Sequence, residues 1–291
     1  MERNNGSIET GEKQKNFNFI AYPIIITIAI AFFYSIPGIL LEQSVGKDAI
    51  TSWKPYILAF SQVFFMLIPA IIAAKYVPLP EGALLKLRGK ITPQMILFAI
   101  VGLVGLRFFA AGYLSLQDMI VPDSLRNAYE EIYKAIDELY SQYLRSDSFG
   151  ALLQSLMIGA LVPAICEETL FRGFLQNSLA QRLKTGTAIV ITGVLFAVLH
   201  MNIIEFIPLV VIGIFLGYSA GISGGLLLPM IIHLLNNAAA IFILYIADKQ
   251  GIGDEYDIMP PYAAGFALLI GILLIWYSIY SMKRYQNSTS A

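Results

Sequence analysis

Two adjacent glutamates lie against an apolar stretch near the middle of the 291-residue chain. Residues 164–176 read AICEETLFRGFLQ and include Glu167, Glu168 and Arg172. A charged side chain at the centre of a membrane-spanning helix costs about 2.5–3.5 kcal/mol on insertion scales, so it requires a partner or a use. Glu168 and Arg172 share one helix face, whereas Glu167 is rotated by about 100° from Glu168. Arg172 therefore neutralises Glu168 more readily than Glu167, and Glu167 is the candidate general base.

The chain has two histidines, and both follow these glutamates within apolar segments. In GVLFAVLH the spacing places Phe196 and His200 on one helix face, so the ring can orient the imidazole. In IIHLLNNAAA the same spacing places His233 and Asn237 on one face. Both side chains of this second pair can donate hydrogen bonds, which is what a developing oxyanion requires. Glutamate, histidine and asparagine side chains from three helices together indicate hydrolysis.

Each pattern also has an interpretation without catalysis. Glu167, Glu168 and Arg172 can form a structural ion-pair network at a helix end. His200 can be a satisfied surface or core residue, and His233 with Asn237 can be a polar clamp between helices. These interpretations become harder to hold when the three patterns are taken jointly.

The elements that must position these residues are membrane-spanning helices. The sequence is 57% hydrophobic and 13% charged, against about 25% charged in soluble domains. Apolar runs of about 20 residues recur along its length, as a bilayer requires. We therefore predict an all-α polytopic bundle of about eight transmembrane helices, with spans near 19–41, 55–77, 94–116, 149–166, 186–204, 205–221, 224–246 and 262–282.

Charge and cysteine content exclude other classes. The net charge is −1, so the chain has no basic field to attract nucleic acid. The single cysteine, Cys166, excludes an intrachain disulfide and a thiolate-only metal site. The expected partners are a protein or peptide substrate and membrane lipid.

Positive charge predicts the orientation in the cell membrane. With a cytoplasmic N-terminus, the cytoplasmic segments hold twelve of the 19 Lys and Arg residues and the opposite side holds six, with Arg107 inside a span. The positive-inside rule then places both termini in the cytoplasm. We divide the chain into an N-terminal tail (1–18), the first transmembrane helices with a surface helix (19–148), a core with the candidate site (149–246), and a last helix with a C-terminal tail (247–291).

Residues 124–146 differ in kind from the apolar runs. Apolar and aromatic residues recur there with a helical period, opposite a charged face. We expect an amphipathic helix that lies at the outer membrane surface or caps the bundle.

The three motifs together resemble a known family. EETLFR, FAVLH and HLLNN match, in order and in residue type, the EExxxR, FxxxH and HxxxN/B pattern of the CPBP family. That family comprises the type II CAAX prenyl endopeptidases and the prokaryotic Abi-type relatives, including bacteriocin-immunity proteins. The resemblance covers about residues 150 to 245, and no matched position departs from the pattern.

The resemblance implies a function and a role for each residue. It implies an intramembrane endopeptidase in a helical bundle whose conical cavity opens to the cytoplasm. Glu167 and His200 would activate a water molecule, and His233 and Asn237 would stabilise the tetrahedral intermediate. Glu168 with Arg172 would support the site. The substrate, and whether it is prenylated, is not implied.

Metal dependence stays open at this stage. One glutamate and two histidines could hold Zn²⁺ or another divalent metal with one position left for water. The sequence lacks the HExxH helix of many zinc proteases. We therefore favour a glutamate-dependent mechanism without a metal.

Three competing hypotheses remain. Cys166 could act as a thiol nucleophile with a histidine, although buried cysteines are commonly inert. A transporter or proton-coupled carrier could use the buried Glu and His residues as relays, and Arg107 fits that hypothesis as well as it fits a structural ion pair. A non-catalytic scaffold or immunity protein is the third hypothesis, and the intact motif set argues against it.

Overall fold

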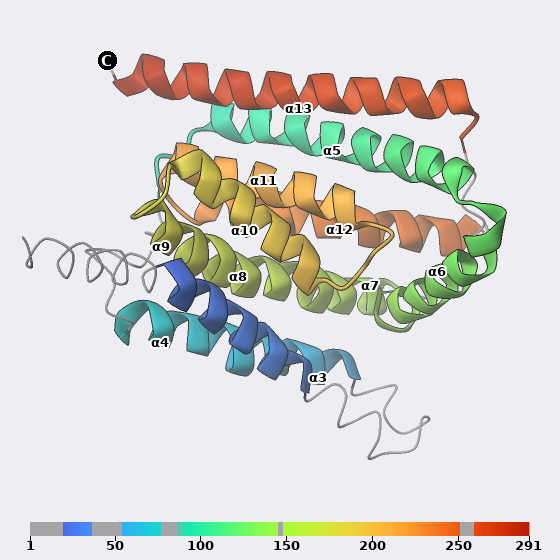
Figure 1. Ribbon diagram of the computed structural model, residues 1–291, viewed down its shortest axis with the longest axis horizontal. Helices are drawn as coiled ribbons and strands as arrows, with labels where there is room; N and C mark the ends of the chain where they lie inside the picture. Colours follow the sequence, from blue (N-terminus) through green and yellow to red (C-terminus); the bar gives the residue numbers. More distant parts are fainter. Residues whose placement is uncertain are drawn as a thin grey trace, which may run out of the picture.

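The computed structural model describes residues 20–36, 54–76, 87, 89–144, 148–250 and 259–290. Within these ranges the chain forms helices and no strands, so the predicted all-α class is confirmed. Figure 1 shows the helices as a layered bundle, with α13 and α5 at one side and α3 and α4 at the other. Helices α8, α10, α11 and α12 lie between these layers and carry the candidate site.

Six of the described helices are long and apolar enough to cross a membrane. They are Pro55–Tyr76, Pro93–Ile120, Phe149–Ala180, Phe206–Ser223, Leu227–Ile246 and Pro261–Ser288. Two further apolar helices, Ile20–Ile36 and Thr185–Leu199, are shorter than the roughly 20 residues that a full crossing needs. A helix thus lies at every predicted apolar run, but the predicted count of about eight spans is not confirmed.

The first half of the chain supplies one side of the bundle. After the helix Ile20–Ile36, the elements are α3 (Lys54–Ser61), η1 (Gln62–Leu67), α4 (Ile68–Tyr76), α5 (Pro93–Ile120) and α6 (Asp123–Leu144). Thr92 caps α5, since its hydroxyl oxygen accepts from the Met95 N–H at 3.3 Å, and Pro93 follows at the first helical position, where its missing N–H costs nothing.

The second half begins with one long, irregular helix. It consists of α7 (Phe149–Leu156), η2 (Met157–Leu161), α8 (Val162–Glu168), η3 (Thr169–Gln176) and α9 (Asn177–Ala180). The span predicted near 149–166 lies within this helix, which continues without a break to Ala180. The glutamates do not end the helix because Glu168 and Arg172 are buried together and paired within it.

Two segments of this helix have π-helical hydrogen bonding, η2 and η3, and they flank the glutamates. Pro163 has no N–H, so the carbonyl of Gly159 lacks its usual helical donor. This carbonyl accepts a hydrogen bond from Asn237 instead, at 3.3 Å. π-Helical segments occur frequently at functional sites because they change the direction in which side chains leave the helix.

The remaining helices are α10 (Thr185–Leu199), α11 (Phe206–Ser223), α12 (Leu227–Gln250) and α13 (Pro261–Ser290). Helices α10 and α11 cross at Gly193 and Gly213, where a Cβ on Gly193 would lie 2.9 Å from the Ile214 nitrogen. Small residues permit this close approach of two backbones. The crossing also leaves the Gly213 carbonyl within reach of Arg172.

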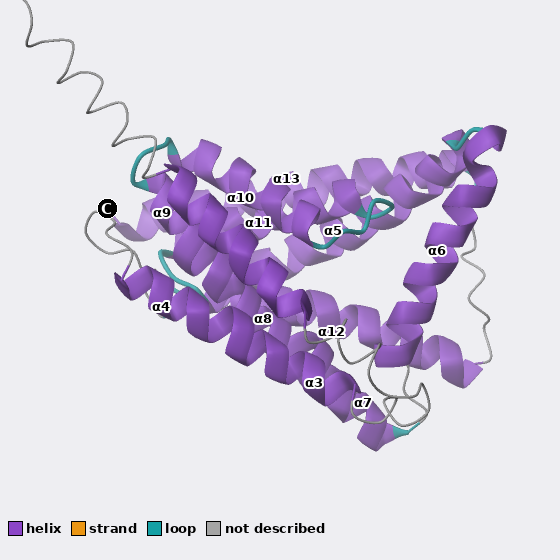
Figure 2. Cartoon of the chain, turned by 60° about the horizontal axis from the view of Figure 1, so that its bottom comes forward, coloured by secondary structure: helices purple, strands orange, loops and turns teal. Residues whose placement is uncertain are grey.

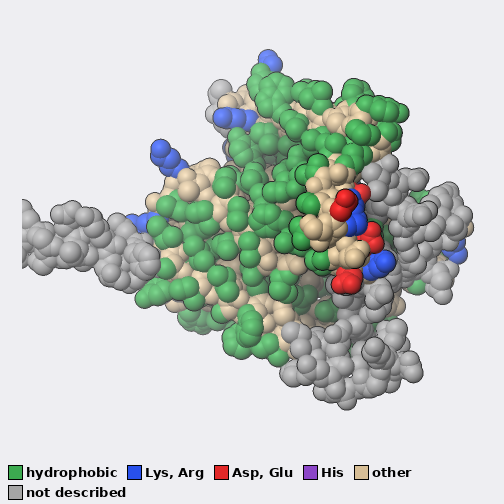
Figure 3. Space-filling view, turned by 45° about the vertical axis from the view of Figure 1, so that its right-hand side comes forward, with side chains coloured by type: hydrophobic (Ala, Val, Ile, Leu, Met, Phe, Trp, Pro, Cys, Tyr) green, Lys and Arg blue, Asp and Glu red, His purple; other side chains and the backbone are tan. Residues whose placement is uncertain are grey.

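The outer surface of the bundle is apolar. Large side chains such as Phe32 and Trp276 are 65% and 62% exposed. Figure 3 shows hydrophobic side chains over most of one face, with Asp and Glu side chains gathered in one area of it and Lys and Arg side chains there and toward the edges. An apolar surface of this extent suits lipid contact rather than water, and the six apolar helices make this a multi-pass membrane protein.

The amphipathic segment forms helix α6, as predicted. Figure 2 shows α6 running across one end of the bundle, from the end of α5 to the start of α7. Asp118 on α5 forms an ion pair with Arg126 on α6, with 2.7 Å between the charged atoms. This pair connects the start of α6 to α5. The predicted tail 1–18 lies outside the described residues, and the other domain boundaries and the position of the termini stay predictions.

Candidate active site

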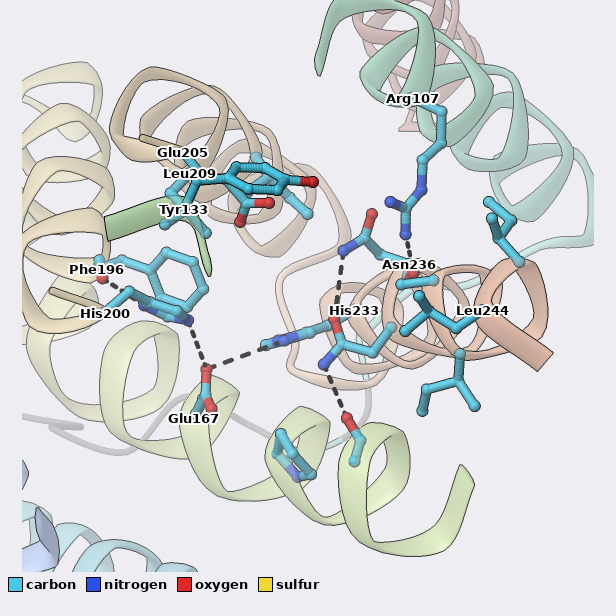
Figure 4. A pocket seen from close by; sticks show the side chains of 17 residues that line it. Arg107, Tyr133, Glu167, Phe196, His200, Glu205, Leu209, His233, Asn236 and Leu244 are labelled. Carbon is cyan, nitrogen blue, oxygen red and sulfur yellow. Dashed lines mark hydrogen bonds and ion pairs between the residues drawn. The ribbon is translucent and has the colours of Figure 1, made fainter. Parts of the chain in front are cut away.

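One cavity of about 410 Å³ brings the candidate residues together. Glu167, His200, His233 and Asn237 all line it, together with Phe196. Figure 4 shows Glu167, His200 and His233 converging from α8, α10 and α12. Its other lining residues are Arg107, Tyr133, Gly159, Pro163, Glu205, Leu209, Ile212, Asn236, Ala240, Ile241, Ile243 and Leu244.

Glu167 lies between the two imidazoles. Its Oε2 atom is 3.8 Å from His200 Nε2 and 3.9 Å from His233 Nε2. Both separations exceed a direct hydrogen bond, but each is short enough for one water molecule to reach both atoms. The Glu167 side chain is 13% exposed and that of His200 is 31% exposed, and both residues line the cavity.

The partner of His200 decides which of its nitrogens carries hydrogen. His200 Nδ1 lies 2.7 Å from the backbone oxygen of Phe196. A carbonyl oxygen can only accept, so Nδ1 is the donor. In the neutral imidazole, Nε2 is then the nitrogen with a lone pair, and it faces Glu167. The Phe196 ring packs beside His200 with 4.3 Å between ring centroids, as the sequence predicted.

His233 is held by a buried carboxylate. Its Nδ1 donates to Glu168 Oε1 at 2.7 Å, and the same oxygen accepts from Arg172 at 2.8 Å. The predicted Glu168–Arg172 pair is therefore confirmed, but the link to His233 was not predicted. A carboxylate hydrogen-bonded to Nδ1 fixes the orientation of the imidazole.

This network is enclosed by protein. The side chains of Glu168, Arg172 and His233 are 0%, 0% and 4% exposed. Arg172 also donates to the Gly213 carbonyl at 2.9 Å and lies 4.8 Å from the centroid of the Phe196 ring. A buried guanidinium needs partners of this kind, because a charge taken out of water without them is costly. The network joins α8, η3, α11 and α12 behind the cavity.

Asn237 reaches the cavity with its amide already oriented. Its nitrogen donates to the Gly159 carbonyl at 3.3 Å, and its oxygen accepts from the Asn236 amide at 3.3 Å. Since an amide nitrogen carries two hydrogens, one remains for another acceptor. Asn236 was not singled out in the sequence, although its position beside Asn237 was a signal that could have found it.

Sequence reasoning gave Arg107 no definite role and missed Tyr133 and Glu205 as cavity residues. Tyr133 comes from the surface helix α6, and Glu205 from the connection before α11, where its N–H donates to the Asn202 side chain at 3.1 Å. Periodicity alone could not show that α6 turns one side chain into the bundle. Cys166 is 1% exposed and does not line the cavity, which gives no support to a thiol nucleophile.

The metal hypothesis can be tested on this geometry. Ligand atoms about 2.1 Å from a tetrahedral zinc ion lie about 3.4 Å apart. The separations of Glu167 from the two histidines are longer, at 3.8 and 3.9 Å. Across the described ranges, no three His, Cys, Asp or Glu side chains are arranged to hold a metal ion. In this arrangement Glu167 lies farther from each histidine than zinc ligands lie from one another, and the metal-free mechanism stays a proposal.

A comparison with protein-family models found one match over the part of the chain that forms this site. Residues 149–239 match the model described as type II CAAX prenyl endopeptidase Rce1-like. This segment includes all four candidate catalytic residues and the buried Glu168–Arg172 pair. A search among curated proteins and a search among solved structures found no match. Over residues 149–239, which form this site, the chain is therefore similar to the type II CAAX prenyl endopeptidase Rce1-like family.

Proposed function

We propose that this protein is an intramembrane endopeptidase that hydrolyses a peptide bond of a membrane-associated protein or peptide. The observation that supports this most strongly is the position of Glu167 Oε2, within 4 Å of both histidine Nε2 atoms in one cavity. A carboxylate and two imidazoles around one cavity can move protons, which hydrolysis requires and helix packing does not.

In the proposed mechanism, Glu167 and His200 activate a water molecule. The water donates one hydrogen bond to the Glu167 carboxylate and the other to the lone pair of His200 Nε2. As the water oxygen forms a bond to the peptide carbonyl carbon, its proton passes to Glu167. When the peptide C–N bond then breaks, Glu167 returns this proton to the leaving amine. The carboxylate is thereby regenerated for the next cycle.

His233 and Asn237 are proposed to stabilise the oxyanion that forms on the carbonyl oxygen. His233 Nδ1 already donates to Glu168, so Nε2 can donate only when the ring is protonated. The second amide hydrogen of Asn237 is the other donor. Donors fixed before the reaction stabilise such a charge without reorganising, and each typically contributes about 10²–10³-fold in rate.

A prediction follows for metal removal. Protein dialysed against a chelator, with its metal content measured by mass spectrometry, is expected to retain its peptidase rate within about two-fold, because Glu167 and His200 activate the water by proton transfer alone. The control is the same protein dialysed without chelator. Activity that disappears with the metal and returns only with added Zn²⁺ would reverse this part of the proposal.

The substrate can be identified in cells. We propose that both termini are cytoplasmic and that the substrate is a membrane-associated protein or peptide, whether lipidated or not. Peptidomics of membranes and protein C-termini, compared between cells with the wild-type protein and cells with Glu167→Ala, is expected to show fragments that depend on Glu167. Identical peptide sets from both cells would contradict the proposed endopeptidase.

A further inference from the structure

Arg107 stands apart from the residues that the proposed mechanism uses. It lies midway along α5 (Pro93–Ile120), a 28-residue apolar helix, and outside the matched segment 149–239. A guanidinium at that depth in a membrane span is expensive and is a marker of function by default. Arg107 nevertheless lines the same cavity as Glu167, so its charge belongs to the space that a substrate would occupy.

The structure fixes the position of the guanidinium. Arg107 donates from one terminal nitrogen to the backbone oxygen of Asn236, the residue before Asn237. Figure 4 shows Arg107 coming down from α5 onto α12, on the far side of His233 and Asn236 from the Glu167–His200 pair. A group lying along the cavity would thus meet Glu167 at one end and Arg107 at the other.

The chemistry of these two ends differs. The end with Glu167 carries the proton-transfer groups, and Glu205 adds a second carboxylate to the wall. Arg107 is the lining residue that is cationic irrespective of pH, because arginine is not deprotonated in proteins. A planar guanidinium can donate two parallel hydrogen bonds to one carboxylate. This arrangement gives geometric specificity as well as affinity.

We propose that Arg107 binds a carboxylate of the substrate and so selects which peptide bond is presented to Glu167. This inference rests on the proposed peptidase function. The carboxylate can come from a free peptide C-terminus or from an acidic side chain close to the cleaved bond. Arg107 acts in this role as a specificity-determining residue and takes no part in the proton transfers.

The test uses a mixed-sequence library of decapeptides, prepared once with free C-terminal carboxylates and once with C-terminal carboxamides. Full-length protein in lipid nanodiscs is incubated with each library, and products are identified by mass spectrometry. We expect the wild-type protein to cleave the acid library about 10- to 100-fold more efficiently near its C-termini, the range for hydrogen bonds to a charged partner. Cleavage of the amide library confined to sites beside Asp or Glu would identify the side chain as the source.

Variants separate binding from structure. Arg107→Gln keeps a donor for the Asn236 carbonyl but removes the charge, and it is expected to bring the acid-to-amide ratio close to one by raising KM for acids. Arg107→Lys keeps the positive charge but not the planar guanidinium, and it should retain part of the preference for the acid library. Arg284→Gln, exposed on α13, makes the same chemical change far from the cavity and should leave the ratio unchanged.

The outcomes distinguish the two proposals. Equal loss of acid and amide cleavage in Arg107→Gln would show that Arg107 only ties α5 to α12, and would overturn this inference while leaving the peptidase intact. A wild-type ratio near one, with no preference for acidic side chains, would overturn it as well. If neither library is cleaved faster by wild-type protein than by Glu167→Gln, the peptidase proposal itself fails.

Discussion

Glu167→Gln is expected to reduce peptide hydrolysis by about 10² to 10⁴-fold, the contribution of a well-placed general base. Glutamine has nearly the same shape but cannot take a proton from water, so the reduction should be in kcat rather than in substrate affinity. Neither histidine is within hydrogen-bond distance of Glu167, since the two separations are 3.8 and 3.9 Å. The measurement is kcat/KM of purified protein in nanodiscs, with the thermal unfolding midpoint as a check on folding.

Glu130→Gln is the matched control, because Glu130 is an exposed residue of α6 and undergoes the same chemical change. Its activity should equal that of the wild-type protein. A Glu167→Gln variant that cleaves at the wild-type rate would exclude Glu167 as the base and would favour a scaffold or carrier function. Reduced activity with a large fall in unfolding midpoint would point to a structural role instead.

Arg172→Gln is expected to lower the free energy of unfolding by about 3–5 kcal/mol, the cost of removing one partner of a buried ion pair. Arg172 and Glu168 are fully buried and 2.8 Å apart, so the variant leaves a carboxylate without its strongest partner. It also removes the donor to the Gly213 carbonyl. Chemical or thermal unfolding in detergent, followed by circular dichroism, measures the effect.

The double variant Glu168→Gln/Arg172→Gln shows whether the uncompensated charge causes the loss. With the Glu168 carboxylate removed together with its partner, we expect the double variant to be more stable than Arg172→Gln alone. It should still be a poor enzyme, because His233 has then lost the carboxylate that orients it. Equal destabilisation in the single and double variants would locate the loss in packing around the Arg172 side chain.

Much of the fold and the candidate site could be predicted from local patterns. Apolar runs located the membrane helices, because length and hydropathy alone decide which segments suit a bilayer. The i to i+4 spacing predicted the Glu168–Arg172 pair and the contact of Phe196 with His200, since both are properties of a single helix.

Contacts between helices could not be predicted in the same way. The hydrogen bond from His233 to Glu168 joins residues that are 65 positions apart, and periodicity says nothing about which helix faces meet. The other partners of the buried Glu168–Arg172 pair could not be predicted for the same reason. Gly213, which accepts from Arg172, and His233, which donates to Glu168, are supplied by other helices.

The cavity draws its walls from two parts of the chain. The reacting groups belong to residues 149–239, whereas Arg107 and Tyr133 come from α5 and α6, which precede that segment. Mutations in these earlier helices can therefore change which substrates bind in the cavity. The side chains that transfer protons stay unchanged. With this architecture, new substrate preferences can evolve through substitutions in the flanking helices while the hydrolytic residues are retained.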